Sequence, residues 1–372
     1  MNGEKITTRQ MILLLTVFRL SLIVSYMPSL DLPPANQDMW IVIFLSLFYS
    51  ILMRIPILFL VNKFNNLSII GYSEKILGKF LGKLVGILYG LYFAIYATFV
   101  ITIQAQLVAA DILPNTPNWL IIGILVVTSL YIGSKGLIVI FRTGELIAPI
   151  TLVSIIILIV LGVRSVEFST FLPILADSKF SEINIGAILL SFLITDIFII
   201  AMNAPYLENK KDINKIYVKA SIYSILLSVI SVMVTQGTLG IEQARHANYP
   251  FLIYTRLIKY ESILQRIDAI YVITWISTNI LRKLIYIYIS YMSFKEVFNK
   301  EDGQWIHYFI GITIGLIAIQ LANTKVIITE DSMLNKFFII SSIIFLTIIP
   351  LITLIVYFFR RKTLNREENS KI

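Results

Sequence analysis

The sequence of 372 residues predicts an all-α polytopic membrane protein, with about ten transmembrane helices in a single integral membrane domain, residues 1–372. Hydrophobic residues make up 57% of the chain and charged residues only 14%. Its mean hydropathy is +0.83, too high for a soluble globule of this length. Apolar runs of about 20 residues, the length that crosses a hydrocarbon core, recur along the chain. Basic residues fall in alternate loops, as cytoplasmic loops require.

The apolar runs predict the helices in order. The first half, residues 10–164, carries the runs 10–29, 39–61, 84–110, 119–140 and 145–164. The second half, residues 186–359, carries the runs 186–206, 217–238, 266–290, 305–322 and 336–359. Residues 360–372 form a basic tail that is predicted to be cytoplasmic. No small-residue cleavage site follows the first run, so it is expected to stay as a helix.

The distribution of charge fixes the expected orientation. The net charge is +9, which by itself is compatible with nucleic-acid binding, but the lysines and arginines are spread over every second loop. The outer segments PSLDLPPANQD and DILPNTPN carry no basic residue, whereas the segment 239–265 carries Arg245, Arg256 and Lys259. Long loops cross largely regardless of their charge. Both termini are therefore predicted to be cytoplasmic, and a nucleic-acid partner is not expected.

Glycines in GYSEKILGKFLGKLVGILYG, residues 71–90, recur every four positions at Gly78, Gly82, Gly86 and Gly90. One helical face is thereby bare, and another backbone can approach it. A phosphate-binding loop needs Ser or Thr after Gly-Lys, and neither follows here. We predict a packing face. The neighbouring basic residues contact anionic lipid or form a solvated face: Lys75, Lys79 and Lys83.

The outer segment GIEQARHANYPFLIYTRLIKYESILQ, residues 240–265, is amphipathic. It is expected to lie along the membrane interface or to form an outer lid, and it is a candidate partner surface. His246 within it and His307 in the ninth helix are two isolated histidines, so no metal site is predicted. Cysteine is absent, and no motif of a nucleophilic or metal-dependent hydrolase is present. The sequence predicts neither an enzyme nor a cofactor.

Two charges lie inside predicted helices. Asp196 stands in SFLITDIFIIAMNAPYL, and Arg19 stands near the middle of the first helix. A carboxylate at mid-membrane costs about 2.5 to 3.5 kcal/mol on insertion scales, so it requires a partner or a task. Each charge precedes a proline, Pro28 or Pro205, by nine residues, in the first helix of each half. Such matching points to inverted five-helix repeats whose interrupted helices meet at a midplane binding site.

The charges are open to two interpretations. Arg19 and Asp196 either form an ion pair that serves structure only, with snorkelling of Arg19 as a variant, or line a cavity where they bind a zwitterionic ligand. Stripes of polar and aromatic residues on the third and eighth helices are typical of packing as well as of such a cavity. Asp268 and Arg282 are expected near the membrane surfaces. The predicted ligand-binding residues, from helices 1, 3, 6 and 8, are Thr16, Arg19, Ser21, Tyr96, Val100, Gln104, Ser191, Thr195, Asp196, Trp275 and Thr278.

Several stretches resemble one known family. They are ITTRQMILLL, GLIVIFRTGELIAP, FLPIL, YPFLIYTRLIKYESILQRIDAIYVITW and LITDIFIIAMNAPYL. Together they are similar to the B subunits of spore germinant receptors, within the amino acid-polyamine-organocation transporter superfamily, over nearly the whole chain. The resemblance implies a LeuT-like architecture and places Asp196 on the acidic position of the family's sixth helix.

The sequence departs from the family pattern at two points. VFRLSLIVSYMPSL has no glycine where the family's first helix is glycine-rich and unwound, and Thr195 stands where glycine usually precedes the acid. Whether helices 1 and 6 unwind is therefore left open. Ser21 and Ser25 can bond backbone groups that a kink would free.

The resemblance implies a receptor subunit in the inner membrane of a spore that binds a small germinant, often an amino acid, and acts with an A subunit and a lipoprotein C subunit. The alternative is an autonomous secondary transporter that couples an amino acid to an ion, with the hydroxyls of Thr274, Ser277 and Thr278 as candidate ion ligands. Hydroxyls in membrane helices more often bond their own backbone. A structural scaffold without a ligand is a third alternative. The germinant, any transported ion and the stoichiometry are not determined by the sequence.

Overall fold

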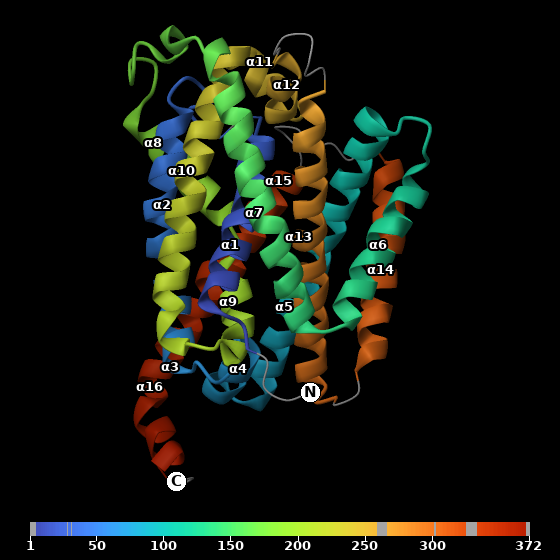
Figure 1. Ribbon diagram of the computed structural model, residues 1–372. Helices are drawn as coiled ribbons and strands as arrows, with labels where there is room; N and C mark the ends of the chain where they lie inside the picture. The colour runs from blue at the N-terminus through green and yellow to red at the C-terminus, as the bar shows by residue number, and fades with distance from the viewer. Residues whose placement is uncertain are drawn as a thin grey trace.

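The computed structural model describes residues 5–27, 29–30, 32–258, 266–300, 303–324 and 333–369, and this part of the chain is nearly all helical (Figure 1). Pro28, residues 259–265 of the outer segment and the last three residues of the tail lie outside it. The helices of the first half are α1 Thr8–Tyr26, α2 Met39–Met53, α3 Ile55–Lys63, α4 Ile69–Leu77, α5 Lys79–Leu107, α6 Asn118–Ser134 and α7 Leu137–Gly162. Those of the second half are α8 Phe180–Leu193, α9 Ile197–Asn203, α10 Ile213–Leu239, α11 Ile241–His246, α12 Pro250–Leu257, α13 Asp268–Val297, α14 Gln304–Asn323, α15 Met333–Ile343 and α16 Ile349–Asn369.

The long helices bear out a multi-pass membrane protein. Within the described residues, seven helices are long and apolar enough to cross a membrane, and the bent pair α2 and α3 makes an eighth candidate. Helix α6 is shorter, with 17 residues. Helix α13 has 30 residues but includes Asp268, Arg282, Lys283 and Lys295. Each of the ten predicted ranges contains helix, while the number that cross the membrane stays a prediction.

Two predicted helices are interrupted. The range 39–61 was predicted as one helix, but α2 and α3 meet at Arg54 with a bend of 44°. Pro56, at the start of α3, explains the break, because proline lacks an N–H and disfavours helical backbone in the residue before it. The range 186–206 is broken at residues 194–196, between α8 and α9. By contrast, α1 runs without interruption through Arg19 to Tyr26.

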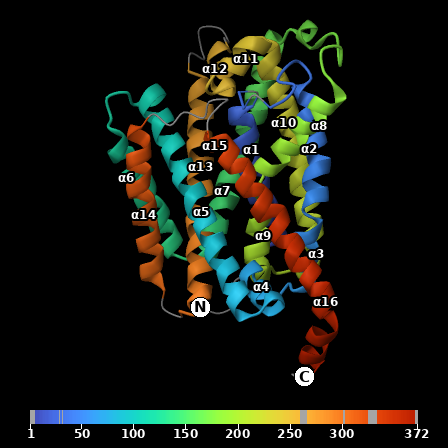
Figure 2. The same cartoon turned by 180° about the vertical axis from the view of Figure 1, so that it is seen from behind.

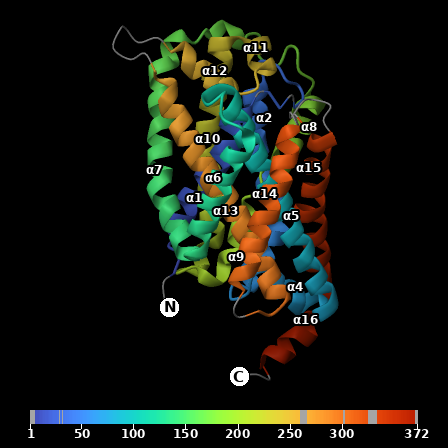
Figure 3. The same cartoon turned by 90° about the vertical axis from the view of Figure 1, so that its right-hand side faces the viewer.

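The contacts between helices repeat across the two halves. Helix α1 packs along α10, and α2 packs along α8, which are equivalent pairs if the first five spans correspond to the last five. Helix α5 packs along α13 through the centre of the bundle, and α6 lies beside α14 at one side of it (Figure 3). Seen from behind, α15 and α16 cross the bundle obliquely toward α3 and α4 (Figure 2). The centre is therefore formed by α1, α5, α9 and α13.

The glycine repeat is a packing face. A Cβ atom at Gly82 would lie 2.2 Å from the Cα of Glu74 in α4, and one at Gly86 would lie 2.4 Å from Val297 of α13. At Gly90, a Cβ would lie 2.8 Å from the Phe294 ring. Close approach of α4 and α13 to α5 thus requires glycine at these three positions, as predicted from their spacing. The prediction is wrong for Gly78, which lies between α4 and α5 with a φ of 91° and has no atom within 4 Å of an added Cβ.

Both ends of the central bundle are covered. Helices α11 and α12 lie across the end shown at the top of Figure 1, where α12 packs on α1, α7, α10 and α13. Phe251 and Tyr254 of α12 are buried, and the Tyr254 hydroxyl donates to the carbonyl oxygen of Leu158 at 2.9 Å. The described part of the outer segment is therefore a lid rather than a helix lying along the interface. At the opposite end, Ile6 pairs with Leu207 through backbone hydrogen bonds that involve Tyr206 and Glu208.

Candidate functional site

Arg19 and Asp196 form a buried ion pair in the middle of the bundle. Nη2 of Arg19 lies 2.6 Å from Oδ2 of Asp196, and the two side chains are 0% and 1% exposed. The guanidinium carbon of Arg19 also lies 5.5 Å from the centre of the Tyr217 ring, a cation–π contact. Nε and Nη1 of Arg19 and Oδ1 of Asp196 have no hydrogen-bond partner among the described residues. The pair thus satisfies only part of the hydrogen-bonding capacity of its two groups.

The break between α8 and α9 places Asp196 at the centre. Asp196 occupies the position before the first residue of α9, without a side-chain hydrogen bond to that helix, and residues 194–196 are non-helical. Inside a membrane, backbone groups freed by such a break need partners. Arg54 supplies them, because its Nη2 donates to the carbonyl oxygens of Ser191 and of Ile194, the latter at 2.9 Å. The interruption of one span is therefore held by a side chain from the interruption of another.

Aromatic side chains surround the pair. The Tyr286 hydroxyl lies 2.7 Å from Oγ1 of Thr195, and the Tyr286 ring packs edge-on against Phe18 of α1. The ring of Tyr96 in α5 contacts the Tyr286 ring, and the Tyr96 hydroxyl lies 2.8 Å from the hydroxyl of Ser342 in α15. Residues of α1, α5, α13 and α15 thus build a wall next to the broken helix.

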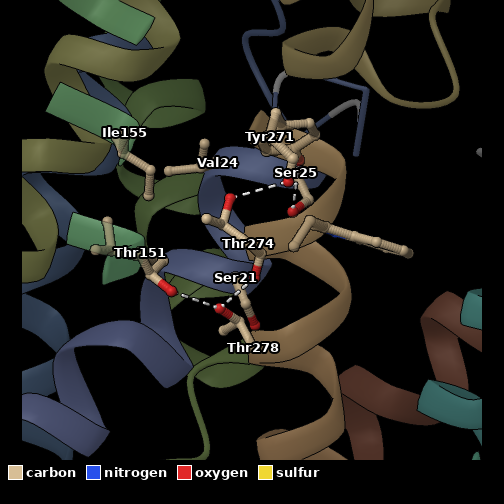
Figure 4. A pocket seen from close by; sticks show the side chains of 10 residues that line it. Ser21, Val24, Ser25, Thr151, Ile155, Tyr271, Thr274 and Thr278 are labelled. Atoms are coloured by element: carbon tan, nitrogen blue, oxygen red, sulfur yellow. Dashed lines mark hydrogen bonds between the residues drawn. The ribbon is translucent and has the colours of Figure 1, made fainter. Parts of the chain in front are cut away.

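A small cavity lies between α1, α7 and α13. Its volume is about 20 Å³, enough for about one water molecule. Hydroxyls of Ser21 and Ser25 from α1, Thr151 from α7 and Thr278 from α13 converge on it (Figure 4). Most of them are engaged: Thr278 donates to the carbonyl oxygen of Thr274, and Tyr271 donates to Ser25. Among the candidates, Ser21, Trp275 and Thr278 line this cavity.

Arg282 approaches the same region. Its Nη1 lies 3.5 Å from the Oγ of Ser21, and its guanidinium carbon lies 5.0 Å from the centre of the Phe18 ring. The expectation that Arg282 lies near a membrane surface is wrong, because Arg282 is buried in the middle of the 30-residue helix α13. For Asp268 the same expectation agrees with the structure, because Asp268 is the first residue of α13 and lies near Arg256 and Arg266.

Gln104 has a buried cationic neighbour. Nζ of Lys283 donates to its Oε1 at 2.6 Å, and the amide nitrogen of Gln104 lies 3.3 Å from the carbonyl oxygen of Ile276. Lys283 is fully buried. This contact joins α5 and α13.

The remaining candidates make local contacts. The hydroxyls of Thr16 and Ser191 donate to carbonyl oxygens of their own helices, those of Ile12 and Ile188. Val100 is half-buried in the apolar packing around α5. The structure therefore brings Arg19, Thr195 and Asp196 together, with Tyr96 in the surrounding wall. Within the described residues, the side chains of Thr16, Ser191 and Val100 make no hydrogen bond to this group.

Sequence reasoning missed four residues of this region: Arg54, Tyr217, Lys283 and Tyr286. A signal was present for Arg54 and Lys283, because each is a basic residue inside an apolar run, as Arg19 is. Tyr217 and Tyr286 had no such signal, since tyrosine is frequent in this chain, with 19 copies.

Comparison with known proteins adds the family and the fold. A family model described as "Spore germination protein" matches residues 5–326. The spore germination protein KB of Bacillus subtilis is 23% identical over 334 residues, which cover 87% of this chain and 86% of that protein. The spore germination protein YndE of the same organism is 22% identical over 301 residues, which cover 80% of this chain and 82% of that protein.

Two solved transporters share the architecture. MhsT, solved with L-phenylalanine, aligns with a TM-score of 0.55 and 14% identity, over 91% of this chain and 98% of that one. Mhp1 is a nucleobase-cation-symport-1 family transporter, solved in a closed conformation with bromovinylhydantoin bound. It aligns with a TM-score of 0.59 and 12% identity, over 96% of this chain and 80% of that one. The predicted LeuT-like architecture is thereby confirmed.

Proposed function

The chain belongs to the spore germination protein family, and on this premise we propose that it is the germinant-sensing membrane subunit of a spore germination receptor. It is a multi-pass membrane protein with a transporter-like fold and is not an enzyme. The observation that carries the proposal is the incompletely bonded ion pair of Arg19 and Asp196 beside a broken helix. Such a site recognises a small molecule that bears opposite charges.

The proposed ligand is an amino acid. Its carboxylate would be received by Arg19 and its ammonium by Asp196, so that the ligand separates two groups which otherwise pair with each other. Helices α1, α5, α13 and the α8–α9 break would line this pocket, with Tyr96, Gln104 and Thr195 at its walls and Ser21, Trp275 and Thr278 toward the cavity. MhsT was solved with an amino acid, which supports a ligand of this class for the shared fold.

An autonomous ion-coupled transporter is the alternative. It requires a cation site, for which the hydroxyls between α1 and α13 are the candidates. Thr274 and Ser277 donate to carbonyl oxygens of their own helix, and the guanidinium of Arg282 lies 3.5 Å from Ser21 at the edge of the cavity. A fixed positive charge at this distance disfavours a bound cation. The receptor is therefore the better supported of the two functions.

We expect the protein to purify from spore membranes together with an A subunit and a lipoprotein C subunit. A tagged chain solubilised in mild detergent should retain both, and the purified chain alone in liposomes should not accumulate radiolabelled amino acids in a sodium or proton gradient. Isolation without partners, under detergent that preserves other membrane complexes, together with gradient-driven uptake would instead establish the transporter.

The orientation in the spore inner membrane is predicted to place both termini in the cytoplasm. The ends of the described chain lie at the same end of the bundle, and the basic loops define which side that is (Figure 1). The chain has no cysteine, so single thiols can be introduced at exposed positions. We expect Lys179→Cys to react with an impermeant maleimide from outside and Lys211→Cys to react only after permeabilisation. The reverse labelling pattern would refute this orientation.

A further inference from the structure

The membrane-spanning helices bury more positive than negative charge. In the part of the chain that the structure describes, the buried charged side chains of these helices and their caps are Arg19, Arg54, Arg282, Lys283, Asp196 and Asp38, the last at the start of α2, where it accepts hydrogen bonds from Leu175 and Ser178. Only Arg19 has a carboxylate partner there. Arg54 and Lys283 are held by neutral oxygens, those of backbone carbonyls and of Gln104. Buried positive charge therefore exceeds buried negative charge among these side chains, and an uncompensated buried charge is strongly unfavourable.

The hydrogen-bonding capacity of the site has the same bias. Nε and Nη1 of both Arg19 and Arg54, and Nε of Arg282, are buried and have no partner among the described residues. Against these five donor atoms stands one unpartnered acceptor of the buried charges, Oδ1 of Asp196. Buried polar atoms in proteins are almost always hydrogen-bonded. The described side chains therefore offer more donors than acceptors here, and a ligand with acceptor oxygens would pair with these donors.

Arg54 lies beside the ion pair. Its Nη2 donates to the carbonyl oxygen of Ile194, two residues before Asp196, at 2.9 Å. Tyr217 contacts the surroundings of both arginines. The guanidinium of Arg19 stacks on the Tyr217 ring, and the Tyr217 hydroxyl donates to the carbonyl oxygen of Ser50, one turn before Arg54. The Nη2 of Arg54 is occupied by the end of α8, which leaves Nε and Nη1 as two separate donors on different edges of the guanidinium. Each can donate a charge-assisted hydrogen bond to a carboxylate oxygen.

We infer that the ligand carries a net negative charge, as an amino acid with a second carboxylate does, and that Arg54 binds this additional group. The inference rests on the proposed function and specifies its ligand class. A neutral zwitterion adds no net charge and leaves the excess of buried positive charge unchanged, whereas a second carboxylate reduces it. Asp196 then accepts the ammonium, Arg19 the first carboxylate and Arg54 the second.

The test uses two nearly isosteric pairs, L-aspartate with L-asparagine and L-glutamate with L-glutamine. Binding to the purified full-length protein in nanodiscs is measured by thermal shift and by calorimetry at constant ionic strength. We expect one acidic amino acid to bind at least about tenfold more tightly than its amide, the effect of one charge-assisted hydrogen bond. Arg54→Gln should remove this preference while the weaker binding of the amide is retained.

Arg360→Gln is the matched control. Arg360 of α16 also donates to a backbone carbonyl oxygen at a helix end, that of Ile76 in α4, and it makes no contact with the ion pair. It should keep the acidic preference. If Arg54→Gln does not fold, the comparison of acid and amide on the unchanged protein still decides the question. Equal binding of acid and amide, or tighter binding of neutral amino acids such as L-alanine, overturns the anionic ligand and leaves the proposed function standing; absence of binding by any amino acid overturns both.

Discussion

Removing either charge of the ion pair, by Arg19→Gln or Asp196→Asn, is expected to raise the germinant concentration required for half-maximal germination by about tenfold or more. Each substitution deletes a charge-assisted hydrogen bond to the ligand, worth about 1.5 to 3 kcal/mol. It also strands the partner charge, which costs about 3 to 5 kcal/mol of stability when a buried pair is broken. Responses therefore have to be compared at equal protein level in the spore membrane, determined by immunoblot.

The double variant separates ligand binding from structural pairing. Replacing a whole buried pair is often neutral for stability, so Arg19→Gln with Asp196→Asn is expected to restore protein level. It should not restore the response, because both ligand contacts are absent. Lys179→Gln with Glu182→Gln, which removes an exposed pair with a separation of 3.8 Å, serves as the control and should leave both unchanged. Full recovery of the germinant response in the Arg19 and Asp196 double variant would mean that the pair is structural only.

Gly82→Ala is expected to destabilise the protein by about 1 to 3 kcal/mol, the usual effect of an added methyl group in a packed interior. The new Cβ would lie 2.2 Å from the Cα of Glu74 and 2.6 Å from its backbone nitrogen, so α4 itself has to move. Because Gly82 lies where α5 meets α4, a displaced α4 would also disturb Ser68, which caps α4 and donates to Glu296 at the end of α13.

The control for this substitution is Gly123→Ala in α6, where no atom lies within 4 Å of the added Cβ. It should be neutral or slightly stabilising, since alanine favours helix over glycine by about 1 kcal/mol. The measurement is thermal unfolding of both variants in the same detergent. Equal melting temperatures would show that α4 adjusts without loss and would contradict the packing role of Gly82.

Features that depend on local composition can be predicted from the amino-acid sequence alone. Apolar runs of spanning length predicted the location of the helices, because backbone groups in a membrane must be bonded within the helix. The spacing of Gly82, Gly86 and Gly90 predicted a packing face, since four residues return to one side of a helix. The mid-membrane positions of Arg19 and Asp196 predicted that they meet, because either charge alone is unfavourable there.

The distant residues that complete the site depend on how the helices pack and cannot be predicted from local patterns. Arg54 belongs to the first half of the chain, yet it bonds the end of α8, 137 and 140 residues away at Ser191 and Ile194. Tyr286 reaches Thr195 from α13, and Arg282 lies in the interior instead of at the membrane surface. Helical periodicity gives the face on which a residue lies but not the neighbour of that face. Which helices approach depends on the packing of the whole bundle, so the excess of buried positive charge becomes visible only when all of these helices are in place.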